Sequence, residues 1–144
     1  MLHPWSVPTP GPNDACPCGR TGPAAKGARV LPWAQCCAPG LADARSIADA
    51  EALMRSRYTA FVLGRMDHLL TTWHPSTRPA DLSLDEGVKW LGLDVRRHRL
   101  LDADHAEVEF VARSRVAGRG QRLHEVSRFV REAGQWYYVD GDVR

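Results

Sequence analysis

The stretch SIADAEALMRSRYTAFVLG, residues 46–64, carries the clearest helix signal in the chain. Its apolar residues recur every three or four positions, so on a helix they form one stripe suited to packing on a core. Either Ser46 or Asp49 can cap the start of this helix, and Gly64 can adopt the left-handed conformation that ends it. The apolar stripe consists of Ile47, Ala50, Leu53, Met54, Tyr58, Phe61 and Val62. We therefore expect one long helix with a single buried face.

The sequence after this helix changes to shorter elements. MDHLLTTWH, residues 66–74, predicts a second helix that ends before a proline. SLDEGVKWLGLDV, residues 83–95, is mixed, because Ser83 can cap a short helical turn that carries Trp90 whereas residues 91–95 can begin a strand. We therefore expect the helical part of the domain to end within this region.

Three later runs alternate between apolar and polar residues, as strands do. They are HAEVEFVARSRV (105–116), RLHEVSRFVRE (122–132) and GQWYYVDG (134–141). The glycine-containing loops AGRG and EAGQ join these runs and predict two antiparallel hairpins. Helices followed by an antiparallel sheet indicate an α+β domain, and a sheet curled around the long helix would make a cone with an open mouth. The alternation does not tell which face of the sheet lines that cone.

The chain upstream of the long helix has a different composition. Eight of the ten prolines lie at or before Pro39, so this part cannot form regular helices or central strands. We expect three regions along the chain. They are a disordered, Pro-rich tail (residues 1–13), a cysteine-containing knuckle with its linker (14–45), and the α+β domain (46–144).

All four cysteines lie in the knuckle, as the two tight pairs Cys16-x-Cys18 and Cys36-Cys37. Four thiolates suit the tetrahedral coordination that zinc prefers, and Gly19 lets the backbone turn so that amide groups point at the sulfurs. The segment lacks the apolar content for a core of its own. Zinc binding would supply the free energy that orders it, about 10–16 kcal/mol for isolated structural sites. We therefore predict a closed structural zinc site without a metal-bound water.

Two other states of the cysteines stay open at this point. Four free thiols are one of them, and two disulfides are the other. Disulfides are disfavoured because the adjacent Cys36 and Cys37 have unsuitable geometry for bonding each other, and because the cytoplasm keeps thiols reduced.

Composition and charge narrow the classes of function. The chain has 144 residues, a formal net charge of +2 and 25% charged residues, which is typical of a globular protein and argues against nucleic acid as a partner. No apolar run reaches the roughly 18 residues of a membrane span. The N-terminal sequence lacks the basic start and apolar core of a secretory signal. We therefore expect a cytoplasmic location.

Polar and aromatic residues of the α+β domain suggest a pocket. TTWHPSTRP supplies Trp73, His74 and Arg78, which combine an aromatic surface, a titratable imidazole and an anion-binding guanidinium. The same residues can instead fill the core and cap helix ends. The strands add further candidates whose carboxylates, if they face the inside, can have a raised pKa. These additional pocket candidates are Trp90, Glu109, Glu125 and Arg128.

Two quoted patterns resemble known families. CPCGRTG…QCC resembles the SEC-C motif, the small zinc module of the SecA translocation motor, with Arg20-Thr21-Gly22 in place of its usual Ser-Gly step. ALMRSRYTAFVLGRMDHLLTTWHPSTRP, WLGLDV, VEFVARSR and HEVSRFVREAGQWYYVDG are similar to the YchJ family of bacterial proteins, over about residues 16–141. This resemblance implies a SEC-C zinc knuckle followed by a cone similar to nuclear transport factor 2 (NTF2). It implies the architecture and no established activity.

The sequence favours a non-enzymatic module that binds a protein or a small ligand and contains a structural zinc ion. A protein partner would bind the knuckle, a small ligand would bind inside the cone, and the sheet could support a homodimer. One alternative is an enzyme that uses His74 together with Glu109 or Glu125 for acid–base chemistry on a small substrate. Association with nucleic acid or the ribosome is the third hypothesis. We predict no catalytic residues.

Overall fold

The computed structural model describes residues 7–22, 29–85 and 87–144. The first six residues of the predicted tail lie outside the described residues, so the disorder of residues 1–13 remains a prediction. Residues 7–13 form no helix or strand. Thr9 Oγ1 nevertheless accepts a hydrogen bond from Arg65 Nη2 at 2.8 Å, which joins this segment to the end of the long helix.

Short elements make up the knuckle. They are β1 (Thr21–Gly22), β2 (Arg29–Val30), the 3₁₀ turn η1 (Trp33–Gln35), α1 (Cys37–Ala42) and the 3₁₀ turn η2 (Ala44–Ser46), and β1 pairs antiparallel with β2. Backbone hydrogen bonds from Cys16 N to Leu31 O (3.0 Å) and from Trp33 N to Asp14 O (2.7 Å) hold the two cysteine-bearing segments side by side. The elements are short, but the expectation that this part cannot form a regular helix is wrong for α1, an α-helix that contains Pro39 near its start. Proline is tolerated in the first turn of a helix, because its backbone nitrogen needs no intrahelical partner there.

The predicted long helix is α2 (Ala50–Leu63). Asp49 is its N-cap and accepts a hydrogen bond from Ala52 N at 2.8 Å, whereas Ser46 belongs to η2. Gly64 ends the helix in the left-handed conformation, with φ of 73°. The second helix, α3 (Met66–Thr71), follows after a short turn.

Four strands form one antiparallel sheet in the order β3-β4-β5-β6. The strands are β3 (Val88–Asp102), β4 (His105–Val116), β5 (Arg119–Glu132) and β6 (Gln135–Val143). The two predicted hairpins, β4–β5 and β5–β6, are confirmed by the strand pairing. The helical turn that we expected around Trp90 is wrong, because β3 begins at Val88 and Trp90 pairs with Ser114.

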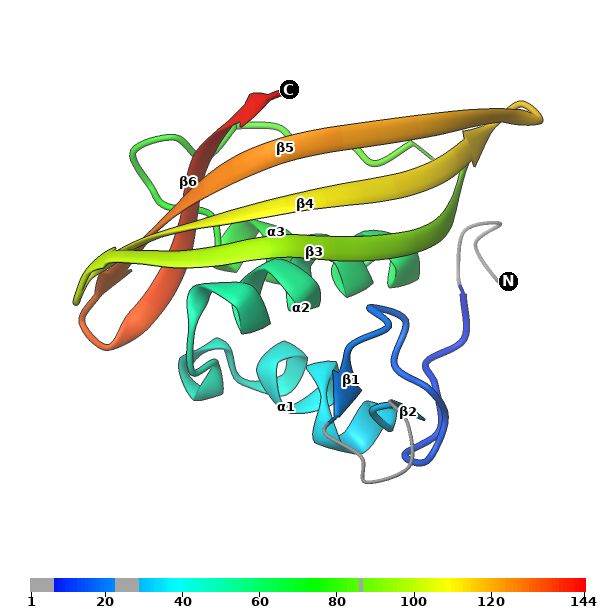
Figure 1. Cartoon of the computed structure of the whole chain (residues 1–144), viewed down its shortest axis with the longest axis horizontal. Helices are drawn as coiled ribbons and strands as arrows, with labels where there is room; N and C mark the ends of the chain where they lie inside the picture. Colours follow the sequence, from blue (N-terminus) through cyan, green and yellow to red (C-terminus); the bar gives the residue numbers. More distant parts are fainter. Residues whose placement is uncertain (1–6, 23–28, 86) are drawn as a thin grey trace.

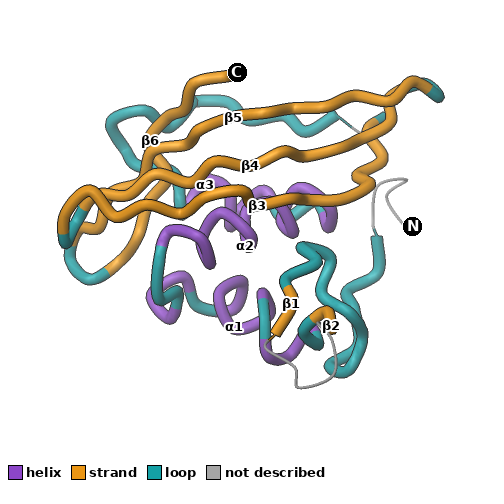
Figure 2. Tube along the Cα trace, viewed as in Figure 1, coloured by secondary structure: helices purple, strands orange, loops and turns teal. Residues whose placement is uncertain are grey.

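The sheet curves over α2, and the knuckle lies on the opposite side of this helix (Figure 1). Figure 2 shows the same order of layers, with the four long strands above α2 and α3, and with α1 and the small β1–β2 ladder side by side below α2. The even-numbered residues of β4, such as Val108 and Phe110, are buried and face α2, which identifies the inner face of the sheet. The prediction of a single buried face on α2 is too narrow, since Ser56 and Thr59 are also buried.

A close contact between Gly40 of α1 and Ile47, which precedes α2, holds the knuckle against this helix. A Cβ atom added at Gly40 would lie 2.8 Å from Ile47 Cγ1 and 3.9 Å from Ser56 Cβ. Only a residue without a side chain fits this approach without movement of Ile47. No helix among the described residues combines the length and the apolar character that crossing a membrane requires.

Candidate metal centre and cone cavity

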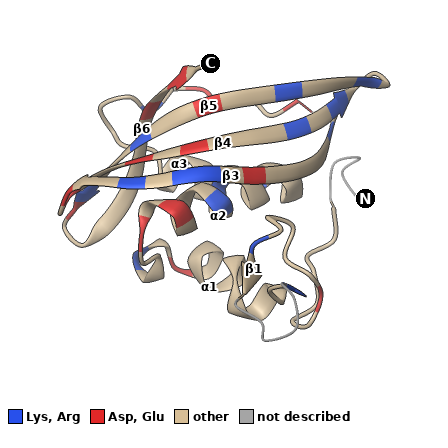
Figure 3. Ribbon diagram, viewed as in Figure 1, with Lys and Arg blue, Asp and Glu red and all other residues tan. Residues whose placement is uncertain are grey.

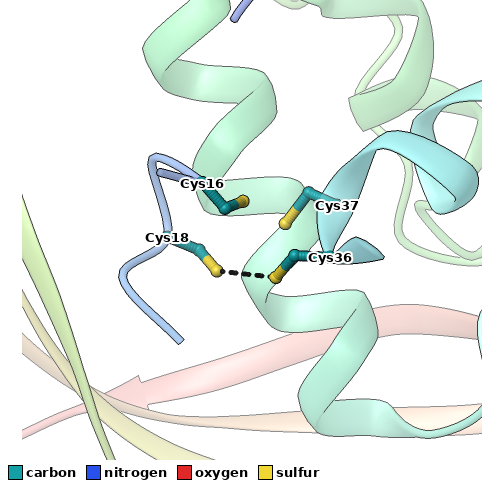
Figure 4. A group of neighbouring side chains, drawn as sticks. All are labelled: Cys16, Cys18, Cys36 and Cys37. Atoms are coloured by element: carbon teal, nitrogen blue, oxygen red, sulfur yellow. Dashed lines mark hydrogen bonds between the residues drawn. The ribbon is translucent and has the colours of Figure 1, made fainter. Parts of the chain in front are cut away.

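The fold brings the four cysteine sulfurs together. Cys16 and Cys18 lie in the loop before β1, and Cys36 and Cys37 lie where η1 passes into α1; Figure 4 shows the four side chains pointing toward a common centre. All four Sγ atoms lie within 4.8 Å of one another, and Cys18 Sγ is 3.5 Å from Cys36 Sγ. The cysteines are not disulfide-bonded, which removes one of the two alternatives.

The sulfur positions fit a four-coordinate metal ion. Sulfurs placed 2.3 Å from a tetrahedral centre are about 3.8 Å apart. The separation of 3.5 Å between Cys18 Sγ and Cys36 Sγ is close to this value. Cys16, Cys18 and Cys37 are buried, and Cys36 is partly buried. With sulfur at every corner, such a site offers no open position to a water or a substrate. The cluster is compatible with metal binding.

Donor groups surround the sulfurs. Arg20 N lies 3.5 Å from Cys18 Sγ, in the turn where Gly19 has φ of 73°, which is the arrangement that the sequence predicts. Two further donors come from α2. Thr59 Oγ1 donates to Cys37 Sγ at 3.4 Å, and Arg55 Nη1 donates to Cys18 O at 3.2 Å and lies 4.0 Å from Cys18 Sγ. Such donors stabilise negative charge on sulfur.

The thiols also influence one another. Hydrogen bonds from Cys18, Cys36 and Cys37 lower the pKa of Cys16, because three neighbours stabilise its thiolate. The hydrogen bonds with Cys16 and Cys18 raise the pKa of Cys37, and burial raises it further. The pKa of Cys18 is also lowered, to about 7, so without a cation the cluster favours ionisation of Cys16 and Cys18 and resists that of Cys36 and Cys37. A divalent ion would remove this resistance.

A cavity of about 160 Å³ lies between α2 and the inner face of the sheet. Of the predicted pocket residues, Trp73, Trp90 and Glu125 line it. Aromatic side chains supply much of the remaining lining, namely Tyr58, Phe61, Phe110, Phe129 and Tyr138. Leu123, which is exposed, lies on its edge, so the cavity reaches the surface.

The other predicted pocket residues do not line this cavity. His74 lies outside it, with Nε2 at 2.7 Å from Glu132 Oε1 and Nδ1 at 2.7 Å from Ser76 Oγ. Arg78 donates to the backbone oxygen of Trp73. Our expectation of a pocket edge formed by His74 and Arg78 is therefore wrong, because local hydrogen bonds hold both side chains in the loop after α3.

The outer face of the sheet carries the remaining two candidates. Glu109 Oε2 lies 2.7 Å from His124 Nε2, and this hydrogen bond lowers the pKa of Glu109, opposite to the raised value that a buried base requires. Arg128 pairs with Asp140 at 2.6 Å and with Asp142 at 2.7 Å. Figure 3 shows acidic and basic residues along the same strands, where such pairs form.

Arg57 is the charged residue of the cavity lining that sequence reasoning missed, along with most of the aromatic lining. It projects from α2, is 6% exposed and lines the cavity. Nη1 donates to Leu69 O and to Thr72 Oγ1, both at 2.8 Å, and the guanidinium lies over the rings of Trp73 and Tyr138. Burial lowers the pKa of Arg57 to about 10, so the side chain is still charged at neutral pH. An arginine within an amphipathic helix gives no sequence signal of burial.

Comparisons with known sequences identify relatives over nearly the whole chain. Residues 49–141 match the family model described as the middle, NTF2-like domain of YchJ. A UPF0225 protein of Polaromonas naphthalenivorans is 65% identical over 130 residues, which are 88% of this chain and 96% of the relative. A UPF0225 protein of Bordetella parapertussis is 52% identical over 138 residues, which are 94% of this chain and 97% of the relative.

Two solved structures share the fold. The solution structure of a SEC-C motif containing protein from Rhodopseudomonas palustris has a TM-score of 0.71 at 34% identity, covering 81% of this chain and 94% of that one. The crystal structure of a SEC-C motif containing protein from Psychrobacter arcticus has a TM-score of 0.71 at 31% identity, covering 92% and 84%. These matches confirm the resemblance and the α+β, NTF2-like cone that the sequence predicts.

Proposed function

This chain belongs to the YchJ family, and from that premise we propose that it is a non-enzymatic binding module. In this proposal a structural zinc ion held by Cys16, Cys18, Cys36 and Cys37 fixes the knuckle against α2. The cone holds a small ligand in its aromatic cavity. A cytoplasmic location would keep the four thiols reduced and available to zinc.

The approach of all four Sγ atoms to within 4.8 Å of one another carries the proposal. Zinc bound there would cross-link two segments separated in the sequence and would supply folding free energy, without taking part in chemistry. The chain contributes the four sulfurs and the donors that stabilise their charge. Of these donors, Thr59 and Arg55 belong to α2, so the metal site and the long helix would be ordered together.

The cavity supports binding better than catalysis. Glu125 is the one carboxylate among the described residues that line it, and its Oε2 accepts a hydrogen bond from Ser127 Oγ at 2.5 Å. His74, the imidazole that we considered as its catalytic partner, is bonded to Glu132 outside the cavity. The arrangement therefore lacks a paired acid and base facing a common substrate position.

The test begins with metal content. Protein purified without added metal is expected to contain one zinc per chain by elemental analysis. Cys36→Ser should lose this zinc, whereas Ala38→Ser, which adds a hydroxyl two residues further along the chain in α1, should retain it. Zinc near zero in the unmodified chain, together with four freely titrating thiols, would contradict the proposal.

Hydrogen exchange then tests the structural role. After chelation, the amides in the described part of the knuckle, residues 14–22 and 29–45, should lose protection while those of β4 and β5 keep it. Equal protection of the knuckle before and after chelation would show that metal does not order it.

A further inference from the structure

We infer that the cone cavity binds a single-ring aromatic acid whose carboxylate pairs with the Arg57 guanidinium. This inference rests on the proposed binding function and names the class of ligand. It depends on three observations: the burial of Arg57, the size and lining of the cavity, and the position of Glu125.

Arg57 is a buried cation with neutral partners. The hydrogen-bond acceptors that the described residues give it are a backbone oxygen, that of Leu69, and a hydroxyl, that of Thr72, and both bond to Nη1. This leaves Nε and Nη2 for a further acceptor. Burying a cation without a matched anion is costly, and a carboxylate is the acceptor that fits the planar guanidinium best.

The size of the cavity limits the ligand. A cavity of about 160 Å³ compares with the roughly 150 Å³ apolar cavities that take up benzene. Its aromatic lining favours a ring over an alkyl chain, because aromatic pairs gain from edge-to-face contacts. The rings already adopt this geometry among themselves, as in the T-shaped pair of Tyr58 and Trp90, with centroids 5.7 Å apart. One ring with one short acidic group therefore fits.

Glu125 refines the class of ligand. It lines the same cavity and acts on Arg57 by Coulomb attraction, so the cavity contains one positive and one negative group. The carboxylate of Glu125 would weaken the binding of a simple aromatic acid. It would favour an acid whose ring also carries a hydroxyl or an amino group as a donor to Glu125. We therefore expect 4-hydroxybenzoate or 4-aminobenzoate to bind more tightly than benzoate.

The direct test is a titration of the metal-loaded full chain at pH 7 with three probes of one shape and different charge. Calorimetry, or fluorescence of the cavity tryptophans, should show that benzoate binds at least about tenfold more tightly than benzamide, since only benzoate pairs with the guanidinium. Benzylamine should bind most weakly. Tighter binding of benzylamine than of benzoate would overturn the assignment to Arg57 while leaving the binding function standing. If none of the three binds to the folded chain, both proposals for the cone fail.

Substitutions then locate the site. Arg57→Gln should reduce the affinity for benzoate to that for benzamide, whereas Arg113→Gln, on the exposed outer face of β4, should leave it unchanged. Arg57→Gln also loses the bonds of Nη1 and can destabilise the fold, so two variants that spare this residue complete the series. Glu125→Gln should tighten benzoate binding several-fold by removing repulsion. Ala112→Leu should abolish binding by filling the cavity; retained binding in Ala112→Leu would place the ligand elsewhere.

Discussion

Thr59→Val isolates the contact by which α2 supports the cysteine cluster. Thr59 is fully buried, and its hydroxyl donates to Cys37 Sγ at 3.4 Å. Valine has nearly the same shape, so the substitution removes the hydrogen bond without opening a cavity. A hydrogen bond to a charged acceptor contributes about 1.5–3 kcal/mol, and loss of a group that orients a metal ligand weakens metal binding about 10–100-fold.

The two magnitudes agree, because a 10–100-fold change corresponds to about 1.4–2.8 kcal/mol. The assay is a competitive titration of zinc against a chromogenic chelator, with Thr71→Val on the exposed surface of α3 as the control. In metal-free protein the acceptor is a neutral thiol, a weak acceptor, so the free energy of unfolding should change by less than about 1 kcal/mol. A zinc affinity of Thr59→Val within threefold of the unmodified chain would refute the reasoning.

Three further predictions concern the fold. Gly40→Ala should lower the free energy of unfolding by about 1–3 kcal/mol in urea denaturation, because the new Cβ would lie 2.8 Å from Ile47 Cγ1; adding Ile47→Ala should reduce the penalty. Ala133→Asn should raise that free energy by up to about 1 kcal/mol, since Ala133 has φ of 49° in the β5–β6 turn, where asparagine is preferred; an unchanged denaturation midpoint would contradict this. Burial, with repulsion from a nearby arginine, lowers the pKa of His68 from 6.5 to about 4, so the unfolded chain binds a proton more readily than the folded one. Stability should therefore fall as the pH drops from about 6.5 toward 4, by on the order of 3 kcal/mol relative to His68→Gln in denaturation series, and an equal pH dependence of both proteins would exclude this residue as the cause.

The parts of the fold that the sequence predicted depend on local patterns. The apolar spacing and the terminal glycine of α2, and the loops of the β4–β5 and β5–β6 hairpins, are each readable within a few residues. The cysteine cluster was equally readable, because all four cysteines lie as two tight pairs within one segment rich in Pro and Gly. In each case the residues that determine a local structure lie within that structure or directly beside it in the sequence.

The parts that the sequence did not predict depend on distant contacts. Ser56 and Thr59 are polar, and contacts with distant parts of the chain bury them: Ser56 Oγ lies 2.9 Å from His68 Nε2 in α3, and Thr59 donates to Cys37 in the knuckle. Glu109 and Glu125 look alike in the strands, but one faces His124 on the outside and the other faces the cavity. The position of α2 determines which face of the sheet is the inner one. The alternation of residues within a strand carries no information about the position of α2.

The cysteine cluster and the cavity both take side chains from α2, and this has a consequence for engineering the knuckle. Arg55 and Thr59 reach the sulfurs from the same helix whose Arg57 and Tyr58 reach the cavity. The knuckle is therefore not a self-contained module. Transplanted to another protein without α2, it would lose the donors that lie near its sulfurs. A successful graft would have to transfer the first three turns of that helix, which include Arg55 and Thr59, or rebuild an equivalent hydroxyl and guanidinium on the host.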